Sequence, residues 1–133
     1  MVDIDYIMSL IDWNNCEQEQ KEGIRLAQNV NCINAFLRPH DRIYNKNVWD
    51  NCAKILSERS DEELEAYLIE LLEWLQDMNW PGAFCIRDRL QKYSDNNSLY
   101  NAINVCIEKA KDCSDEVWES NLYSLLQKKK SLT

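Results

Sequence analysis

Few residues in this chain can do covalent or metal chemistry. It has one histidine, His40, and six cysteines, Cys16, Cys32, Cys52, Cys85, Cys106 and Cys113. No two cysteines have the short separation that zinc knuckles use, and none lies near His40 in sequence. Disulfide frameworks are typical of short, loop-rich secreted chains, and this sequence is not of that kind. We therefore expect no metal and no cofactor, with buried structural thiols at Cys52, Cys85 and Cys106.

Carboxylates are abundant, but their pattern does not predict catalysis. Glu63, Glu70, Glu73 and Asp77 fall on one side of a helix when residues are placed at steps of about 100°. A general acid and base need carboxyl groups whose pKa values are separated by burial, which an exposed stripe does not provide. The chain also has no glycine-rich loop to hold a phosphate. We expect a protein that is not an enzyme, whose acidic stripe is either a solvated face or a partner surface.

These carboxylates lie on the best-defined predicted helix, residues 60–81. Ser60 and Glu63 form a capping box at its start, and Pro81 ends it. Its buried face is a stripe of leucines at three- and four-residue spacing, Leu64, Leu68, Leu71, Leu72 and Leu75. Trp74 falls at the border between the leucines and the acidic stripe, where it would anchor a partner. Trp80, held extended before Pro81, is either a packing wedge between helices or a recognition residue.

Length and composition predict one all-α domain over residues 1–133. The chain is long enough to bury a hydrophobic core of its own. Apolar residues make up 45% of it, whereas glycine and proline occur only twice each, which leaves few tight turns for β-hairpins. An all-β fold is therefore not expected.

The net charge of −8 argues against nucleic acid and anionic membranes as partners and favours a cationic protein. The basic cluster Lys128, Lys129 and Lys130 ends the last predicted helix, where cations oppose the helix dipole. No apolar run approaches the ~20 residues that cross a bilayer, and the N-terminus is acidic, unlike a signal peptide. We expect a cytoplasmic protein.

Helical periodicity and capping residues predict seven to eight helices. They cover residues 4–11, 16–30, 31–37, 47–58, 60–81, 81–93, 99–112 and 115–129, with Ser114 as the cap of the last. The longest connection, residues 38–46, is either a plain connector or a functional loop. Tyr44 in this loop is a second candidate for partner contact.

Two predicted helix pairs look like copies of one another. Residues 60–72 align with residues 114–126, sharing the Ser-Asp-Glu start, a later glutamate and three leucines. The preceding helices align as well, with Asn47 and Cys52 matching Asn101 and Cys106. Antiparallel helix pairs that repeat along a chain are typical of an α-solenoid of the HEAT or armadillo type. We therefore expect that architecture.

The segment WLQDMNWP within residues 71–83, LLEWLQDMNWPGA, resembles the signature of a family of small bacterial all-helical domains of unknown function with HEAT-like helical pairs. Relatives of this kind often accompany polymorphic toxin systems as immunity proteins. The resemblance thus implies a helical-repeat fold and a toxin as partner. The resemblance rests on this short motif, and the rest of the chain shares only its general helical character with the family.

Three functions follow as hypotheses. The first is an immunity protein that binds a cationic toxin domain, with Glu63, Glu70, Glu73, Trp74 and Asp77 as the contact surface and the Tyr44 loop as a second one. The second is a small structural or adaptor domain with no toxin, in which the acidic residues only maintain solubility. The third is a redox or zinc protein that uses Cys106 and Cys113.

Overall fold

The structure is a computed structural model that describes residues 3–39 and 43–131. Within these ranges the chain forms helices and turns but no strand, which confirms the all-α class. The α-helices are α1 (Ile4–Leu10), α2 (Glu17–Ala27), α3 (Trp49–Ser57), α4 (Asp61–Leu64), α5 (Leu68–Glu73), α6 (Ala83–Gln91), α7 (Asn96–Asp112) and α8 (Glu116–Ser131). The 3₁₀ helices are η1 (Ile33–Phe36), η2 (Lys46–Val48), η3 (Glu65–Tyr67) and η4 (Trp74–Gln76). No helix in the described ranges combines the length and the apolarity needed to cross a membrane. His40 lies outside those ranges.

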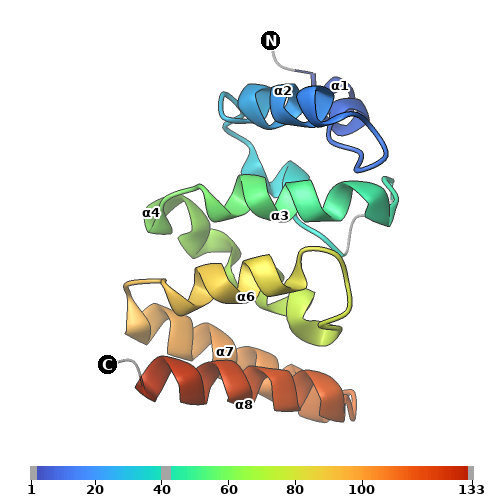
Figure 1. The fold of residues 1–133 in the computed structure, drawn as a ribbon. Helices are drawn as coiled ribbons and strands as arrows, with labels where there is room; N and C mark the ends of the chain where they lie inside the picture. Colours follow the sequence, from blue (N-terminus) through green and yellow to red (C-terminus); the bar gives the residue numbers. More distant parts are fainter. Residues whose placement is uncertain (1–2, 40–42, 132–133) are drawn as a thin grey trace.

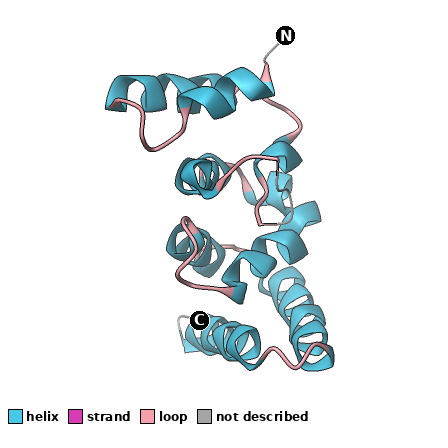
Figure 2. Cartoon of the chain, turned by 90° about the vertical axis from the view of Figure 1, so that its right-hand side faces the viewer, coloured by secondary structure: helices cyan, strands magenta, loops and turns pink. Residues whose placement is uncertain are grey.

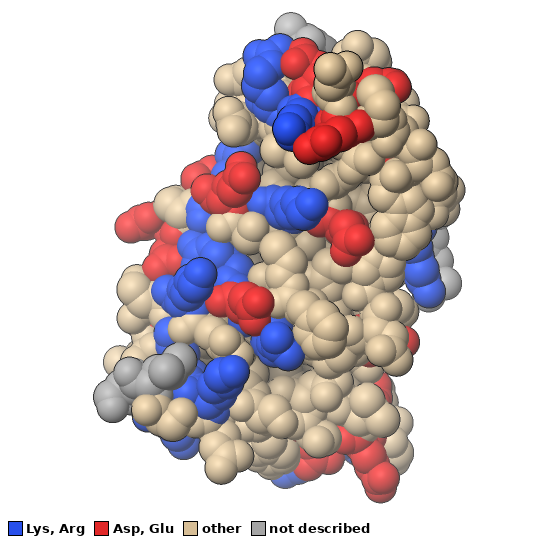
Figure 3. Space-filling model, viewed as in Figure 1, with Lys and Arg blue, Asp and Glu red and all other residues tan. Residues whose placement is uncertain are grey.

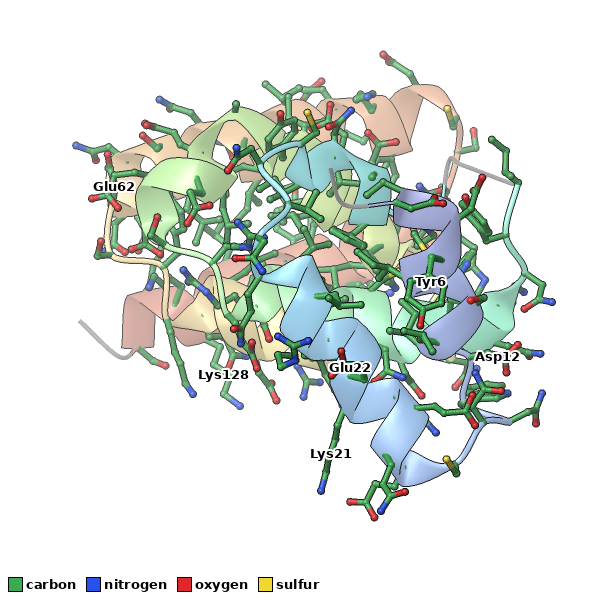
Figure 4. The ribbon with its side chains drawn as sticks, turned by 90° about the horizontal axis from the view of Figure 1, so that it is seen from above. Tyr6, Asp12, Lys21, Glu22, Glu62 and Lys128 are labelled. Carbon is green, nitrogen blue, oxygen red and sulfur yellow. The ribbon has the colours of Figure 1, made fainter. Side chains whose placement is uncertain are left out.

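Most of the helices are arranged in two layers (Figures 1 and 2). In the front layer α3, α6 and α8 lie one below another and run in the same direction, so their C-terminal ends share the left edge of Figure 1. In the back layer α4, α5 and α7 run the opposite way, and α5 packs on α7. The α1–α2 pair lies on top of the two layers, and the axis of α2 crosses the helices below it at an angle (Figure 4). One hydrophobic core, from Ile7 in α1 to Leu125 in α8, joins these elements.

A basic side chain connects each helix of the front layer to the helix above it. Arg59, after α3, donates to two carbonyl oxygens at the end of α2, at 2.7 and 2.8 Å. Arg89 of α6 donates to two at the end of α3, at 3.1 and 2.9 Å. Lys129 of α8 donates to two at the end of α6, those of Gln91, at 2.7 Å, and Tyr93. Because the last carbonyls of a helix have no partner within it, this cation ladder satisfies them and opposes the helix dipoles.

Asp61 joins the ladder to the back layer. Its carboxylate accepts hydrogen bonds from Arg89 Nη2 at 2.6 Å and from the backbone N and Oγ of Ser94 at 2.9 and 2.6 Å. Burial alone would raise the pKa of Asp61, but the hydrogen bonds from Ser94 and Arg89 outweigh it and hold this pKa below its ordinary value. The ionised carboxylate therefore fixes the start of α4 against α6 and the turn that follows.

The predicted helix over residues 60–81 is broken in the structure. The capping box between Ser60 and Glu63 is confirmed. However, η3 separates α4 from α5, and the helical segment ends with η4 at Gln76, before Pro81. Asp77 is extended, and its carboxylate accepts from the backbone N of Asn79 at 2.9 Å. This local side-chain hydrogen bond stabilises a turn in place of a further helical one.

The predicted internal repeat does not correspond to repeated packing. Residues 60–72 form α4, η3 and most of α5 in the back layer, whereas residues 114–126 lead into α8 in the front layer (Figure 1). Helices aligned by sequence therefore occupy different layers. Ser60 caps α4, whereas the aligned Ser114 has a positive φ in the turn after α7, so the matching residues do not occupy equivalent positions.

Ser114 ends α7 and does not cap α8, contrary to the prediction. It has a positive φ of 54°, and the backbone N of Asp115 donates to Ala110 O at 2.8 Å, as in a Schellman motif. The N-cap of α8 is Asp115, whose carboxylate accepts from Trp118 N at 3.0 Å. Serine at this left-handed position is strained relative to glycine.

Replacing Ser114 by glycine should raise the free energy of unfolding by about 0.5–1 kcal/mol, because glycine adopts this backbone conformation without steric cost. Urea denaturation followed by circular dichroism measures the change. Ser124→Gly, at an exposed position inside α8, is the control and should lower stability by a similar amount. A loss of stability in both variants would refute the assigned strain at Ser114.

Candidate functional site

The predicted acidic stripe does not exist as one surface. Glu63 lies beside Ser60 at the first turn of α4 and pairs with Arg59 at 2.9 Å. The hydrogen bond from Arg59, followed by that from the Ser60 backbone, holds the pKa of Glu63 below its ordinary value. Asp77 lies at the opposite end of the segment, in the turn after η4. These two carboxylates are therefore placed at separate ends and serve local structure.

Glu73 and Trp74 are buried, so their prediction as exposed contact residues is wrong. Trp74 has 0% exposure, and its Nε1 donates to Pro81 O at 2.9 Å. Glu73 is 7% exposed and lies 3.7 Å from the Nζ of Lys109. The prediction assumed one buried face, but α5 packs on α7 while η4 packs on α6 and α8, which covers the segment on several sides.

Trp74 belongs to a cluster of tryptophans. The ring of Trp49 meets Trp74 edge to face at 6.1 Å and Trp80 at 5.5 Å. Trp80 is partly buried and packs on the core, which supports its interpretation as a wedge. Three of the five tryptophans thus serve packing between α3, η4 and the turn before α6.

Tyr44 lies apart from the other predicted site residues. It is partly buried, its hydroxyl hydrogen-bonds the carboxylate of Asp5 in α1, and Arg38 lies 5.5 Å from its ring centroid. These contacts hold the described part of the loop against the first helix. Residues 40–42 of the predicted loop lie outside the described ranges.

Of the predicted contact residues, Glu63 and Glu70 each line a surface hollow. The hollow at Glu63 also contains its ion-pair partner Arg59, whereas the groove at Glu70 has no basic residue among its described lining. The groove runs between α5 and α7, has a volume of about 390 Å³, and is lined by Glu65, Ala66, Leu68, Ile69, Glu70, Ser98, Asn101, Ala102 and Val105. None of these described lining residues is Lys or Arg. Val105 is 47% exposed and Ile69 is partly buried, so the floor presents apolar surface to solvent. We call this feature the acidic groove.

The thiol of Cys106 lies beside the acidic groove. Cys106 is fully buried, and its Sγ lies 4.0 Å from Ile69 O. Burial raises the pKa of Cys106 to about 12, with further contributions from Glu73 and Glu70 that Lys109 partly opposes. This thiol is therefore protonated and unreactive at neutral pH.

The other cysteines divide by exposure. Cys52 is buried as predicted, whereas Cys85 is only half-buried and Cys16, Cys32 and Cys113 are exposed. All six lie in the described ranges and none forms a disulfide there. Among the described residues no three His, Cys, Asp or Glu side chains gather where they could hold a metal ion.

The acidic groove can hold a basic side chain of a partner. A lysine or arginine could lay its aliphatic stem on Ile69 and Val105 while its head group meets Glu65 and Glu70. Sequence reasoning identified Glu70 but missed Glu65 and Val105. Val105 carried a signal, because it is an apolar residue off the buried stripe of its helix.

Comparison with known proteins gives one family match. The model of a domain of unknown function, DUF5071, matches residues 43–132. This match covers α3 to α8 and includes every residue that lines the acidic groove. Searches of curated proteins and of solved structures gave no match.

Proposed function

The chain belongs to the DUF5071 family of domains of unknown function, and we propose that it is a non-enzymatic protein-binding module. Its partner in this proposal is a cationic bacterial toxin domain, which the chain neutralises as an immunity protein. The acidic groove between α5 and α7 is the binding surface.

The observation that carries this proposal is the composition of the acidic groove. Two carboxylates, Glu65 and Glu70, flank apolar surface, and no described cation lines the groove to neutralise them. Apolar surface bordered by like charges is suited to a partner of opposite charge, which it attracts over long range and desolvates on contact. The net charge of −8 acts in the same direction. The role as an immunity protein rests on the resemblance of the WLQDMNWP segment.

We also propose that the fold is a HEAT-like α-solenoid. The support is the cation ladder, in which Arg59, Arg89 and Lys129 make the same kind of contact at three successive steps. In a solenoid each repeat contacts only its neighbours, and the same kind of contact recurs at each step. Such folds present long helix faces, and these suit protein binding.

Charge reversal in the acidic groove tests the binding surface. The probe is a toxin encoded next to this gene, co-expressed with the chain in a growth assay. Glu65→Lys with Glu70→Lys should abolish rescue of growth and weaken binding about tenfold to a hundredfold, because like charges then meet. Binding by the unaltered chain should weaken as salt rises.

The matched control is Glu58→Lys with Asp112→Lys. It changes the net charge equally, and both exposed residues lie at helix C-terminal ends, where a cation is favourable. The control should rescue growth as well as the unaltered chain. Equal loss of rescue in both double variants would show that the toxin recognises the total charge of the chain and not the groove. If no neighbouring toxin exists and no rescue occurs, the adaptor hypothesis replaces this one.

A further inference from the structure

A second hollow, on the opposite layer, has the reverse charge. It lies between α6 and α8, has a volume of about 240 Å³, and is lined by Leu75, Met78, Arg87, Gln91, Asn121, Ser124, Leu125 and Lys128. Two of these described lining residues are cations and none is Asp or Glu. The front layer that holds this α6–α8 hollow faces the viewer in Figure 3, where Lys and Arg lie toward the shared C-terminal edge, interspersed with Asp and Glu.

The polar groups of the α6–α8 hollow surround an apolar floor. Leu75 and Leu125 are 1% and 2% exposed and close the bottom. The side-chain nitrogen of Asn121 donates to Leu75 O at 2.8 Å, which fixes this amide beside the hollow. Lys128 projects outward from α8 and lines the hollow (Figure 4).

Arg87 is held at the rim in a defined orientation. Its guanidinium lies 4.7 Å from the ring centroid of Phe84, which is 58% exposed, and its Nη2 lies 3.1 Å from the carboxylate of Asp88. An exposed aromatic ring stacked by arginine is typical of protein-binding hot spots. A hollow of this size admits one side chain.

We propose that the α6–α8 hollow receives a glutamate side chain from an acidic segment of a protein. The methylenes of the glutamate would lie on Leu75 and Leu125, and its carboxylate would meet Lys128 and Arg87. A carboxylate fits better than a phosphate, because the neighbouring Asp88 repels a dianion more strongly than a monoanion. This inference does not depend on the acidic groove, which lies between helices of the back layer.

A titration of the ¹⁵N-labelled full chain tests the proposal. The probes are the blocked tripeptide acetyl-Leu-Glu-Leu-amide, its Gln counterpart and inorganic phosphate. The Glu peptide should shift the side-chain amide signals of Asn121 and Gln91 saturably, and the Gln peptide should not. Lys128→Met should weaken this binding at least fivefold. Lys54→Met is the control, because Lys54 is exposed on α3 in the same layer but outside the hollow, and it should leave binding unchanged.

Four results would overturn the proposal. Equal shifts with the Gln peptide would show that the carboxylate is not recognised. Equal or tighter binding of phosphate would assign the hollow to small anions in place of a protein segment. An unchanged titration in Lys128→Met, or equal weakening in Lys54→Met, would show that the signals report only general charge screening.

Discussion

Replacing Arg89 by methionine should lower the free energy of unfolding by about 3–5 kcal/mol, the largest effect we expect from one substitution. The Arg89 side chain is 14% exposed, and its guanidinium binds Ser57 O, Arg59 O and the carboxylate of Asp61. Methionine fills a similar volume but leaves two carbonyl oxygens and a partly buried carboxylate without these donors. Urea denaturation followed by circular dichroism gives the loss.

Two further variants isolate the role of the ladder. Arg87→Met on the same helix should change stability by less than about 0.5 kcal/mol, because Arg87 is 36% exposed and its described contacts, an ion pair with Asp88 and stacking on Phe84, lie at the surface. The loss of stability in Arg89→Lys should lie between those of the two methionine variants. One ammonium group cannot reproduce the planar geometry by which the guanidinium reaches three acceptors. If Arg89→Met were no less stable than Arg87→Met, the cation ladder would not hold the layers together.

Replacing Gly82 by alanine should lower the free energy of unfolding by about 3 kcal/mol. Gly82 is the N-cap of α6 with a φ of 86°, a conformation that costs other residues about 1–2 kcal/mol. An added Cβ would also lie 2.7 Å from Ala53 Cβ and 3.0 Å from Trp49 O, which adds overpacking. Thermal and urea denaturation both report the change.

A double-mutant cycle separates strain from clash in this turn. Ala53→Gly removes the nearest atom, so Gly82→Ala should be at least about 1 kcal/mol less damaging in that background. The loss of stability that remains in the Ala53→Gly background measures the cost of the positive φ at position 82. Additive effects of the two substitutions would contradict the close approach of α3 to the start of α6.

The sequence predicted those features that depend on neighbours along the chain. The capping box at Ser60 and the leucine stripe that begins at Leu64 each act within a few residues, and the structure confirms the cap and the burial of the leucines. The single helix that they predicted is broken by η3 and ends at η4. The early stop at Asp77 also has a local cause, an aspartate that bonds Asn79 N. Proline is the stronger signal for a helix end, so the helix was predicted to reach Pro81 and the stop at Asp77 was missed.

Features that depend on packing between distant segments could not be predicted in the same way. On an isolated helix Trp74 falls at the border between the leucines and the acidic residues, and it is buried because η4 contacts both α6 and α8. The acidic groove joins Glu65 and Glu70 to Val105 of another helix, and only the contact of α5 with α7 brings them together. The cation ladder has backbone carbonyls as its acceptors, which leave no pattern in the residue types.

Site-specific photo-crosslinking tests the central claim, binding of a cationic protein in the acidic groove, most directly. A photoreactive p-benzoyl-phenylalanine replaces Val105 in the groove or, as control, Val117 on α8, which are 47% and 63% exposed. In cells that produce the chain, irradiation should join Val105 variants, but not Val117 variants, to one protein that carries a basic domain. Adducts from position 117 alone, or an acidic partner at position 105, would contradict the account.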